Sequence, residues 1–223
     1  MVRWGMVIDL TKCAGCQTCT VACKVENALG PRIQRVTVVE KEIGTFPKVT
    51  RLYIPKRCMN CKDPQCVEVC PSGATEQRED GIVVINKDDC IGCRYCMMAC
   101  PYNARMFRGV ERSYFDSPSK WEQRRYPEHD VGVVDKCDFC AERVDQGLAN
   151  GLKPGDDLDA TPFCVFACIS NAMEFGDLDD PDSKVSQLIK ERGGFQLLPE
   201  METDPSVYYL PRRQGDDEEN TDE

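Results

Sequence analysis

Short apolar runs alternate with polar segments rich in glycine and proline along most of this 223-residue chain. Two runs have the length of a strand, 6–8 and 82–85, and an extended stretch around 207–210, punctuated by prolines, is expected to wrap the body or a partner. Apolar residues recur at helical spacing in 140–149, and again after Asp180-Pro181, a pair that can cap and start a helix ending at Gly193-Gly194. The pattern predicts small strands and short helices joined by long loops.

The sequence contains no stretch close to the ~20 apolar residues that a membrane-spanning helix needs. The longest apolar pieces are 81–85 and 163–169. A strand-like run begins almost at once, without the pattern of a signal peptide. We therefore expect a chain that does not itself cross a membrane, and that is either cytoplasmic or exported together with a partner carrying the signal.

The formal net charge is −10, but the acidic residues are unevenly distributed. Residues 214–223 hold six acidic side chains and no basic ones. This composition predicts a disordered acidic tail on a body of nearly balanced charge. A nucleic-acid-binding protein would need a basic face, which the sequence does not suggest.

Sixteen cysteines fall into four groups of four. The groups are Cys13, Cys16, Cys19 and Cys23; Cys58, Cys61, Cys66 and Cys70; Cys90, Cys93, Cys96 and Cys100; and Cys137, Cys140, Cys164 and Cys168. The first and third have the C-x2-C-x2-C-x3-C spacing of bacterial ferredoxins, in which the fourth cysteine reaches another cluster. At four ligands per cubane, the cysteines predict four [4Fe–4S] clusters and a role in electron transfer.

An internal repeat relates the groups. Adding 77 to the number of each cysteine in the first group gives the third group, and the same offset takes Gly15 to Gly92. An offset of 79 takes Cys58 and Cys61 to Cys137 and Cys140. We interpret this as two copies of one module. The glycines would let the loop turn tightly and bring amides towards cluster sulfurs, although an ordinary turn has the same geometry.

The prolines suggest which groups share clusters. Pro71 and Pro101 follow the last cysteines of the second and third groups, whereas no proline follows Cys23 or Cys168. We therefore pair the second group with the third and the first with the fourth. The hypothetical ligand sets are Cys13, Cys16, Cys19 and Cys168 (cluster one); Cys23, Cys137, Cys140 and Cys164 (cluster two); Cys58, Cys61, Cys66 and Cys100 (cluster three); and Cys70, Cys90, Cys93 and Cys96 (cluster four).

Nested ligation predicts an α+β fold of two ferredoxin-like dicluster modules, one inserted in the other, with long loops. The expected outer module comprises 1–50 plus 130–178, and the inserted module comprises 51–129. Residues 179–213 would be a C-terminal docking extension, followed by the tail 214–223. Four basic residues lie next to cysteines and could raise cluster potentials, or be ordinary surface charges: Lys12, Lys24, Arg57 and Lys136.

Two other classes of protein fit the sequence less well. A structural zinc module would use paired C-x2-C knuckles, and only the fourth group comes near that arrangement; a disulfide scaffold fits still less. For an enzyme with its own active site, the only histidine is His129, in a charged loop where a solvent-facing role is expected. No glycine-rich dinucleotide motif or Ser/His/Asp set is evident, so we expect a non-catalytic subunit with no catalytic residues.

The segments 3–19 and 89–102 resemble those of the four-cluster electron-transfer subunits of complex iron–sulfur molybdoenzymes, such as dimethyl sulfoxide, polysulfide, thiosulfate, tetrathionate and arsenate reductases. The resemblance covers about residues 3 to 178. It implies the nested ligation above, a catalytic partner with a molybdopterin cofactor of molybdenum or tungsten, and often a membrane subunit that reacts with quinone.

The resemblance further implies a position peripheral to a membrane within a complex. The chain would be periplasmic if it is co-exported with the catalytic subunit, and cytoplasmic otherwise. Some relatives have one cysteine of the third group replaced and hold a three-iron cluster there, but Cys93 is present in this chain. An electron-transfer subunit of a formate dehydrogenase or hydrogenase complex is the alternative, although such subunits often carry a C-terminal membrane helix.

Overall fold

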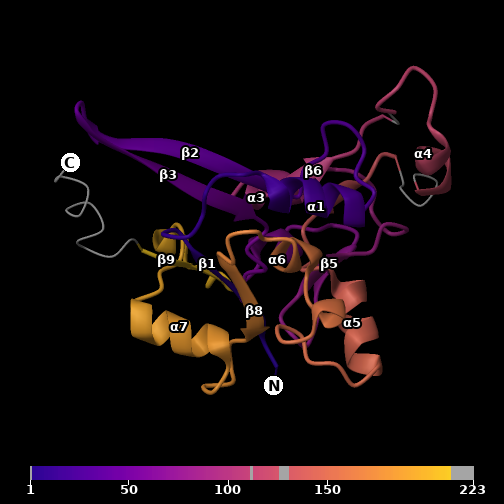
Figure 1. Cartoon of the computed structure of the whole chain (residues 1–223). Helices are drawn as coiled ribbons and strands as arrows, with labels where there is room; N and C mark the ends of the chain where they lie inside the picture. The colour runs from indigo at the N-terminus through magenta and orange to yellow at the C-terminus, as the bar shows by residue number, and fades with distance from the viewer. Residues whose placement is uncertain (1, 111–112, 126–130, 212–223) are drawn as a thin grey trace.

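The computed structural model describes residues 2–110, 113–125 and 131–211 (Figure 1). His129 and the acidic segment 214–223 lie outside the described residues, so the expectations about them stay predictions. Within these ranges the chain forms short strands and short helices, which is the mixed α and β composition expected from the sequence. None of the helices in these ranges combines the length and the apolar character that crossing a bilayer requires.

The strands are β1 (Trp4–Asp9), β2 (Val36–Thr45), β3 (Lys48–Arg57), β4 (Thr75–Gln77), β5 (Val83–Ile85), β6 (Arg105–Phe107), β7 (Val134–Lys136), β8 (Met173–Asp177) and β9 (Val207–Leu210). The helices are α1 (Thr18–Glu26), α2 (Gln65–Glu68), α3 (Tyr95–Ala99), α4 (Lys120–Arg125), α5 (Ala141–Ala149), α6 (Phe163–Phe166) and α7 (Lys184–Arg192), with 3-10 turns at Leu158–Ala160 and Pro199–Met201.

The strand β1 is the middle of a three-stranded sheet with the order β8-β1-β9. It runs antiparallel to β8 and parallel to β9, so that Ile8 lies opposite both Met173 and Tyr209. All six residues of β1 are buried, because both of its edges are paired and both of its faces are covered. Ile8 belongs to the main core, whereas Val7 packs with Val185 of α7 on the other face.

The main core combines apolar side chains with cysteines. Trp4 of β1 stacks on Phe175 of β8 with 5.5 Å between ring centroids, and Phe139 meets the same ring edge-on. The buried cysteines of this core are Cys19, Cys23, Cys58, Cys137, Cys164 and Cys168. These predicted cysteine ligands are therefore part of the main core, where they pack with residues of the central sheet.

The strands β2 and β3 form a long antiparallel hairpin that extends away from the body of the molecule (Figure 1). Its register runs from Val36 opposite Arg57 at the base to Thr45 opposite Lys48 at the turn. Phe46 in the turn is 91% exposed. Most residues of β2 are exposed, and only Pro55 and Arg57 of β3 are buried, so the sequence lacks the clean alternation of a half-buried strand and the hairpin was not predicted.

Several local expectations are confirmed and two are wrong. The structure contains strands at 6–8, 83–85 and 207–210, and α5 covers most of the predicted helix 140–149. The i, i+4 spacing of Cys96 and Cys100 suggests that one short helix presents both, but α3 ends at Ala99, and Cys100 has an extended backbone because a residue before proline is disfavoured in the α conformation. The helix after Asp180 begins later than expected, with Ser183 accepting a hydrogen bond from the backbone nitrogen of Ser186.

Candidate iron–sulfur sites

The loops of the first and third cysteine groups have the same backbone conformation. Gly15 and Gly92 adopt left-handed φ angles of 68° and 67°. Gln17 and Arg94, which directly precede α1 and α3, have φ angles of 63° and 65°. The repeat seen in the sequence is therefore also present in the chain geometry. A Cβ atom at Gly92 would meet the carbonyl oxygen of Gly132, so this loop also needs glycine for close packing.

The structure brings Cys168 to the first cysteine group. Burial raises the pKa of the Cys13 thiol, and the neighbouring charges of Cys168 and Cys16 raise it further. Cys13 also raises the pKa of the buried Cys19 thiol, although burial is the main cause there. The backbone nitrogen of Ala172 donates a hydrogen bond of 3.4 Å to Cys168 Sγ. The four cysteines of the first hypothetical set therefore lie in one neighbourhood.

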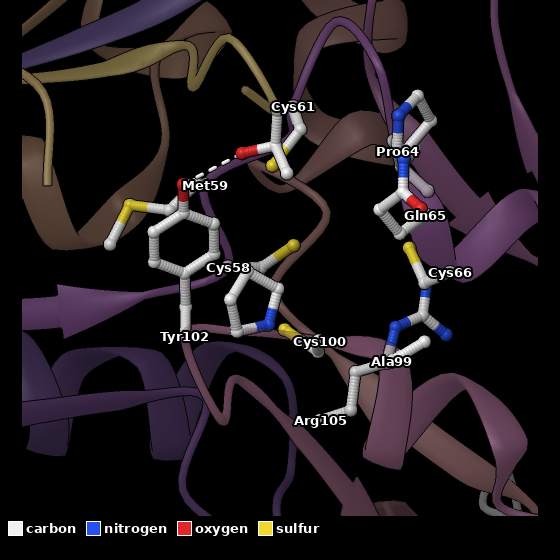
Figure 2. Close-up of a pocket in the computed structure, with 13 residues that line it drawn as sticks. Cys58, Met59, Cys61, Pro64, Gln65, Cys66, Ala99, Cys100, Tyr102 and Arg105 are labelled. Atoms are coloured by element: carbon white, nitrogen blue, oxygen red, sulfur yellow. Dashed lines mark hydrogen bonds between the residues drawn. The ribbon is translucent and has the colours of Figure 1, made fainter. Parts of the chain in front are cut away.

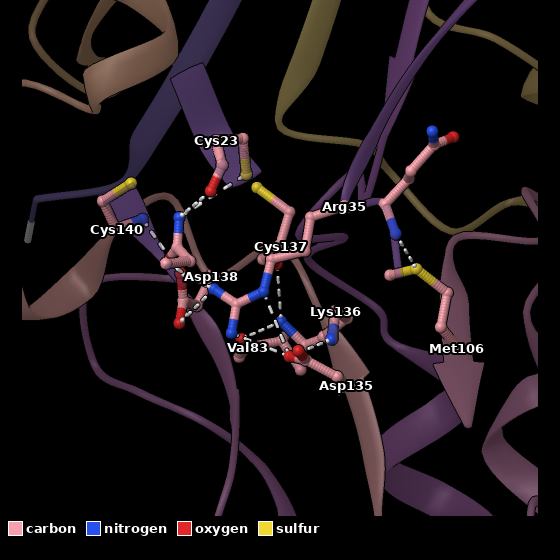
Figure 3. Close-up of polar contacts among 11 residues, drawn as sticks. Cys23, Arg35, Val83, Met106, Asp135, Lys136, Cys137, Asp138 and Cys140 are labelled. Carbon is pink, nitrogen blue, oxygen red and sulfur yellow. Dashed lines mark hydrogen bonds and ion pairs between the residues drawn. The ribbon is translucent and has the colours of Figure 1, made fainter. Parts of the chain in front are cut away.

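Cys23 of α1 lies beside the fourth group (Figure 3). Burial raises the pKa of its thiol far above the usual range, and the charges of Cys137, Cys164 and Cys140 add to the shift. Burial likewise raises the pKa of Cys137 to about 12. The Asn27 side chain donates a hydrogen bond of 3.5 Å to Cys23 Sγ. These four thiols are thus close enough to interact strongly in a dry interior.

The third hypothetical set surrounds a pocket (Figure 2). Cys58, Cys61, Cys66 and Cys100 all line it, and it encloses about 360 Å³ of empty space including its opening. Burial raises the pKa of Cys61 to about 12, and the charges of the other three cysteines add to the shift. Tyr102 stands at the wall of this pocket. Cysteines from two separate groups, such as Cys66 and Cys100, therefore converge on one space.

Cys70 of the second group lies with the third group. Burial raises the pKa of the Cys96 thiol, and Cys70 and Cys90 are the cysteines whose charges raise it further. The backbone nitrogen of Thr75 donates a hydrogen bond of 3.4 Å to Cys70 Sγ. Cys93 is exposed in the loop between Cys90 and Cys96, and no direct interaction with the other three thiols is seen for it.

The chemistry of the donors suits [4Fe–4S] clusters. Each set offers thiols, which bind iron as thiolates and release protons when they do so. The buried Arg57 Nε and the buried Nε and Nη2 of Arg105 make no hydrogen bond to any other residue that the structure describes. Both guanidinium groups lie against cysteine sulfurs. Because an unsatisfied buried N–H costs free energy, these guanidinium groups fit a bound cluster, whose sulfur atoms would supply the missing acceptors.

The cysteines are not arranged for a single metal ion. Among residues 2–110, 113–125 and 131–211, no three Cys, His, Asp or Glu side chains converge closely enough to ligate one ion. The sulfurs of the third set instead stand around an open space (Figure 2).

Of the four basic residues noted beside cysteines, two are buried and two are not. Arg57 and Lys136 are each 2% exposed. Lys12 is exposed, and the Lys24 ammonium group donates to the carbonyl oxygens of Gly30 and Ile33 rather than to sulfur. The expectation that a basic residue raises the reduction potential of a nearby cluster therefore keeps its physical basis only at Arg57 and Lys136.

Two features of the sites were missed from the sequence. Arg105 is buried beside Cys66 and Cys96 but is five residues from the nearest cysteine in the chain, so adjacency did not reveal it. Thr203 comes from the C-terminal segment and lines the pocket of the third set. No sequence signal marks Thr203, because only the folded chain brings it to the cysteines.

Comparison with known proteins gives matches along nearly the whole chain. Residues 49–114 match the family model of the 4Fe-4S dicluster domain. A selenate reductase subunit from Mesobacillus selenatarsenatis is 42% identical over 222 residues, covering 94% of this chain and 72% of that protein. The arsenate respiratory reductase iron–sulfur subunit of a Shewanella species is 39% identical, covering 94% of this chain and 96% of that protein.

The name of a third relative refers to menaquinone instead of selenate or arsenate. The menaquinone reductase iron–sulfur cluster-binding subunit of Nitratidesulfovibrio vulgaris is 40% identical over 233 residues, covering 96% of this chain and 90% of that protein. Proteins that share this much sequence over this much length share a fold and a cofactor type.

Proposed function

The chain belongs to the family of four-cluster [4Fe–4S] electron-transfer subunits of complex iron–sulfur molybdoenzymes, and we propose that it connects a molybdopterin-containing catalytic subunit with a quinone-linked membrane subunit. As a member of this family it is a non-catalytic subunit that transfers electrons through [4Fe–4S] clusters. The observation that carries the proposal is the gathering of cysteines from distant groups, above all around the pocket of the third set.

We propose the four ligand sets that the sequence suggested. The charge interactions of Cys13 with Cys168, and of Cys23 with Cys137, support clusters one and two. The pocket lined by Cys58, Cys61, Cys66 and Cys100 supports cluster three. The interaction of Cys96 with Cys70 and Cys90 supports cluster four. The same crossing of groups supports two ferredoxin-like modules, although the proposed boundary at residue 50 falls within β3.

The clusters would follow one another in numerical order. Cys19 of the first set interacts with Cys164 of the second, and Cys137 of the second interacts with Cys58 of the third. Arg105 interacts with cysteines of both the third and the fourth sets. Neighbouring clusters would therefore lie side by side, which is the arrangement that stepwise transfer of single electrons needs. Cys16 and Cys93, in the first and fourth sets, are exposed, so the two ends of this path would reach the surface.

The proposed partner subunits rest on the comparison with the relatives. The selenate reductase and menaquinone reductase relatives align with nearly all of this chain. We therefore propose a catalytic subunit at one end of the path and a quinone-linked partner at the other, with the chain peripheral to the membrane. It would be periplasmic if the catalytic subunit carries an export signal, and cytoplasmic otherwise.

The proposal is tested by anaerobic purification of the tagged full chain from its native host. We expect about sixteen iron and sixteen sulfide per chain, together with a second subunit that contains molybdenum or tungsten. Addition of a quinol, or of the substrate of the catalytic subunit, should change the reduction state seen by EPR. A chain that purifies with its iron but without a molybdenum or tungsten subunit would contradict the proposed partner, and zinc in place of iron would contradict the cofactor.

A further inference from the structure

Three cations are buried in the interior without a carboxylate partner. Arg57, Lys136 and Arg105 are 2%, 2% and 3% exposed, and none of them forms an ion pair with a carboxylate of the described residues. Arg35 shows the ordinary alternative: it is also buried, but Asp135 lies 2.7 Å from it and Asp138 lies 3.3 Å from it (Figure 3). An isolated buried charge is costly, so the three other cations need negative charge from another source.

Arg57 lies between the first and second ligand sets. Its Nη1 atom donates a hydrogen bond of 3.0 Å to Cys164 Sγ of the second set, and its Nη2 atom lies 3.2 Å from the sulfur of Met173. Burial raises the pKa of Cys19 in the first set and of Cys137 in the second, and at both the Arg57 charge is the largest opposing influence. One guanidinium group thus acts on both sets.

Arg105 lies between the third and fourth sets. In Figure 2 its guanidinium group points at Cys66. Burial lowers the pKa of Arg105, but the charges of Cys66 and Cys58 in the third set, and of Cys96 in the fourth, raise it by more. Its one hydrogen bond to oxygen joins Nη1 to Thr75 Oγ1 at 3.2 Å.

Lys136 lies between the second and third sets. It directly precedes Cys137 of the second set, and its ammonium group donates to the carbonyl oxygens of Val83 and Cys137 (Figure 3). Its charge also opposes the effect of burial on the pKa of Cys66, which belongs to the third set. Carbonyl dipoles solvate this ammonium group, but they do not neutralise it.

We propose that Arg57, Lys136 and Arg105 are fixed counter-charges, one at each junction between neighbouring clusters, and that each raises the reduction potential of the two clusters beside it. This inference rests on the proposed ligand sets. Each reduction adds one electron, and therefore one negative charge, close to a cation that no carboxylate neutralises. A cation stabilises the reduced state of both neighbours, so the electron meets favourable charge at every junction. The three residues act on potential through position and charge and transfer no electrons themselves.

The test is an EPR-monitored redox titration of the complete complex. The reduction steps are first assigned with a Cys-to-Ser variant of each ligand set. Arg57→Gln and Arg105→Gln then remove one charge each, Lys136→Met does the same at the middle junction, and Arg57→Lys and Arg105→Lys retain the charge. Arg78→Gln is the matched control, because Arg78 is already paired with Asp80 and Asp145. Iron and sulfide are measured on every sample.

A neutral variant should lower the reduced-to-oxidised ratio of the two clusters beside it about tenfold at fixed potential, equivalent to about 59 mV for one electron. The potentials of the other two clusters should stay close to those of the unchanged protein. All four potentials should do so in the Lys variants and in Arg78→Gln. Potentials that do not move in variants with full iron content, or that move equally at all four clusters, would overturn the inference.

The two proposals fail in different ways. Iron, sulfide and four assigned reduction steps in the unchanged complex test the proposed clusters, whereas the shifts in the variants test the counter-charges. If a neutral variant loses only the two clusters beside it while its Lys counterpart keeps them, the charge requirement is confirmed by iron content. Equal loss in the neutral and Lys variants would instead mean a packing role and would contradict the inference.

Discussion

Tyr102 and Thr203 share a hydrogen bond of 2.7 Å between their hydroxyl groups, although 101 residues separate them in the chain. Both side chains are buried and both line the pocket of the third cysteine set, where Figure 2 labels Tyr102. The Thr203 hydroxyl also opposes the effect of burial on the pKa of Cys61, as a hydrogen-bond donor to the sulfur does. The C-terminal segment therefore supplies part of the wall of a cluster site.

Thr203→Val should weaken this site without emptying it. The variant loses a buried hydrogen bond, which costs about 1 kcal/mol of stability, and removes a donor from Cys61. We expect a lower urea midpoint for the loss of cluster absorbance and a lower potential of cluster three. Tyr208→Phe is the control, because the Tyr208 hydroxyl accepts a hydrogen bond from the Gln196 side chain and does not line the pocket of the third set. Equal behaviour of the two variants would contradict this role of Thr203.

The crossing of the fourth cysteines can be tested with two serine variants. Cys168→Ser should alter the EPR signal of the cluster that the first group holds, because Cys168 lies beside Cys13. Cys70→Ser should alter the signal of the cluster held by the third group, because Cys70 lies beside Cys96. Each signal is identified beforehand with Cys13→Ser and Cys96→Ser. A Cys168 variant that perturbs the third group's cluster would refute the pairing.

Glycine at position 92 is required for packing as well as for conformation. Gly92→Ala would bring a Cβ atom against the carbonyl oxygen of Gly132, and the φ of 67° adds roughly 1–2 kcal/mol of strain. We expect loss of the fourth cluster, measured as iron per chain. Gly73→Ala is the matched control: Gly73 has a φ of 70°, but an added Cβ would meet no atom within 4 Å, so it should keep its iron.

Glu122 should hold the 113–125 segment in place at all ordinary pH values. Hydrogen bonds from the backbone nitrogens of Tyr114 and Ser119, and from nearby serine hydroxyls, lower its pKa to about 2. Since the folded pKa is below the ordinary value of 4.5, the stabilisation is complete above 4.5 and is lost as the pH falls through about 2.

The corresponding measurement is amide hydrogen exchange. Glu122→Gln should speed exchange at Tyr114 and Ser119, and the ratio of variant to unchanged protein should be constant from about pH 5 to 8, where the carboxylate is ionised. Glu142→Gln is the control, since among the described residues the Glu142 carboxylate accepts a hydrogen bond from the exposed Gln146 side chain and from no backbone nitrogen. A ratio that shrinks towards pH 5 would contradict the low pKa.

Removal of the clusters should unfold the chain. Six cysteines belong to the main core, and three buried cations, which form no ion pair with a carboxylate of the described residues, would lose the negative charge of the clusters. After anaerobic chelation, we expect loss of far-UV circular dichroism and of cooperative urea unfolding. Iron and sulfide added back should restore both. A chelated chain that still unfolds cooperatively would show that the apolar core suffices.

The sequence predicted those parts of the molecule that are marked by local spacing. The cysteine groups, the repeat from Gly15 to Gly92, the strands near 6–8 and 82–85 and the helix starting near residue 140 are all visible in the sequence pattern, and the structure contains each of them. The hairpin of β2 and β3 was not predictable in this way, because neither of its faces is buried along most of its length.

The buried cations could be predicted from the sequence only in part, because a position next to a cysteine does not determine whether a basic side chain is buried. Arg57 and Lys136 were noticed because each directly precedes a cysteine, whereas the equally buried Arg105 was not. Lys24 directly follows Cys23, but its ammonium group donates to the carbonyl oxygens of Gly30 and Ile33. Whether a charge near a cluster is buried depends on what the rest of the chain packs over it, and single-sequence spacing does not contain that information.

The position of β1 has a consequence for how the protein is made. The middle strand of this sheet is synthesised long before its two partners, which are residues 173–177 and 207–210. A growing chain thus carries β1 with both edges open until residues 173–177 have been made, and with one edge open until residues 207–210 follow. Closure of the sheet, and the loading of iron that depends on the folded core, are therefore expected to come after residue 210 has been made.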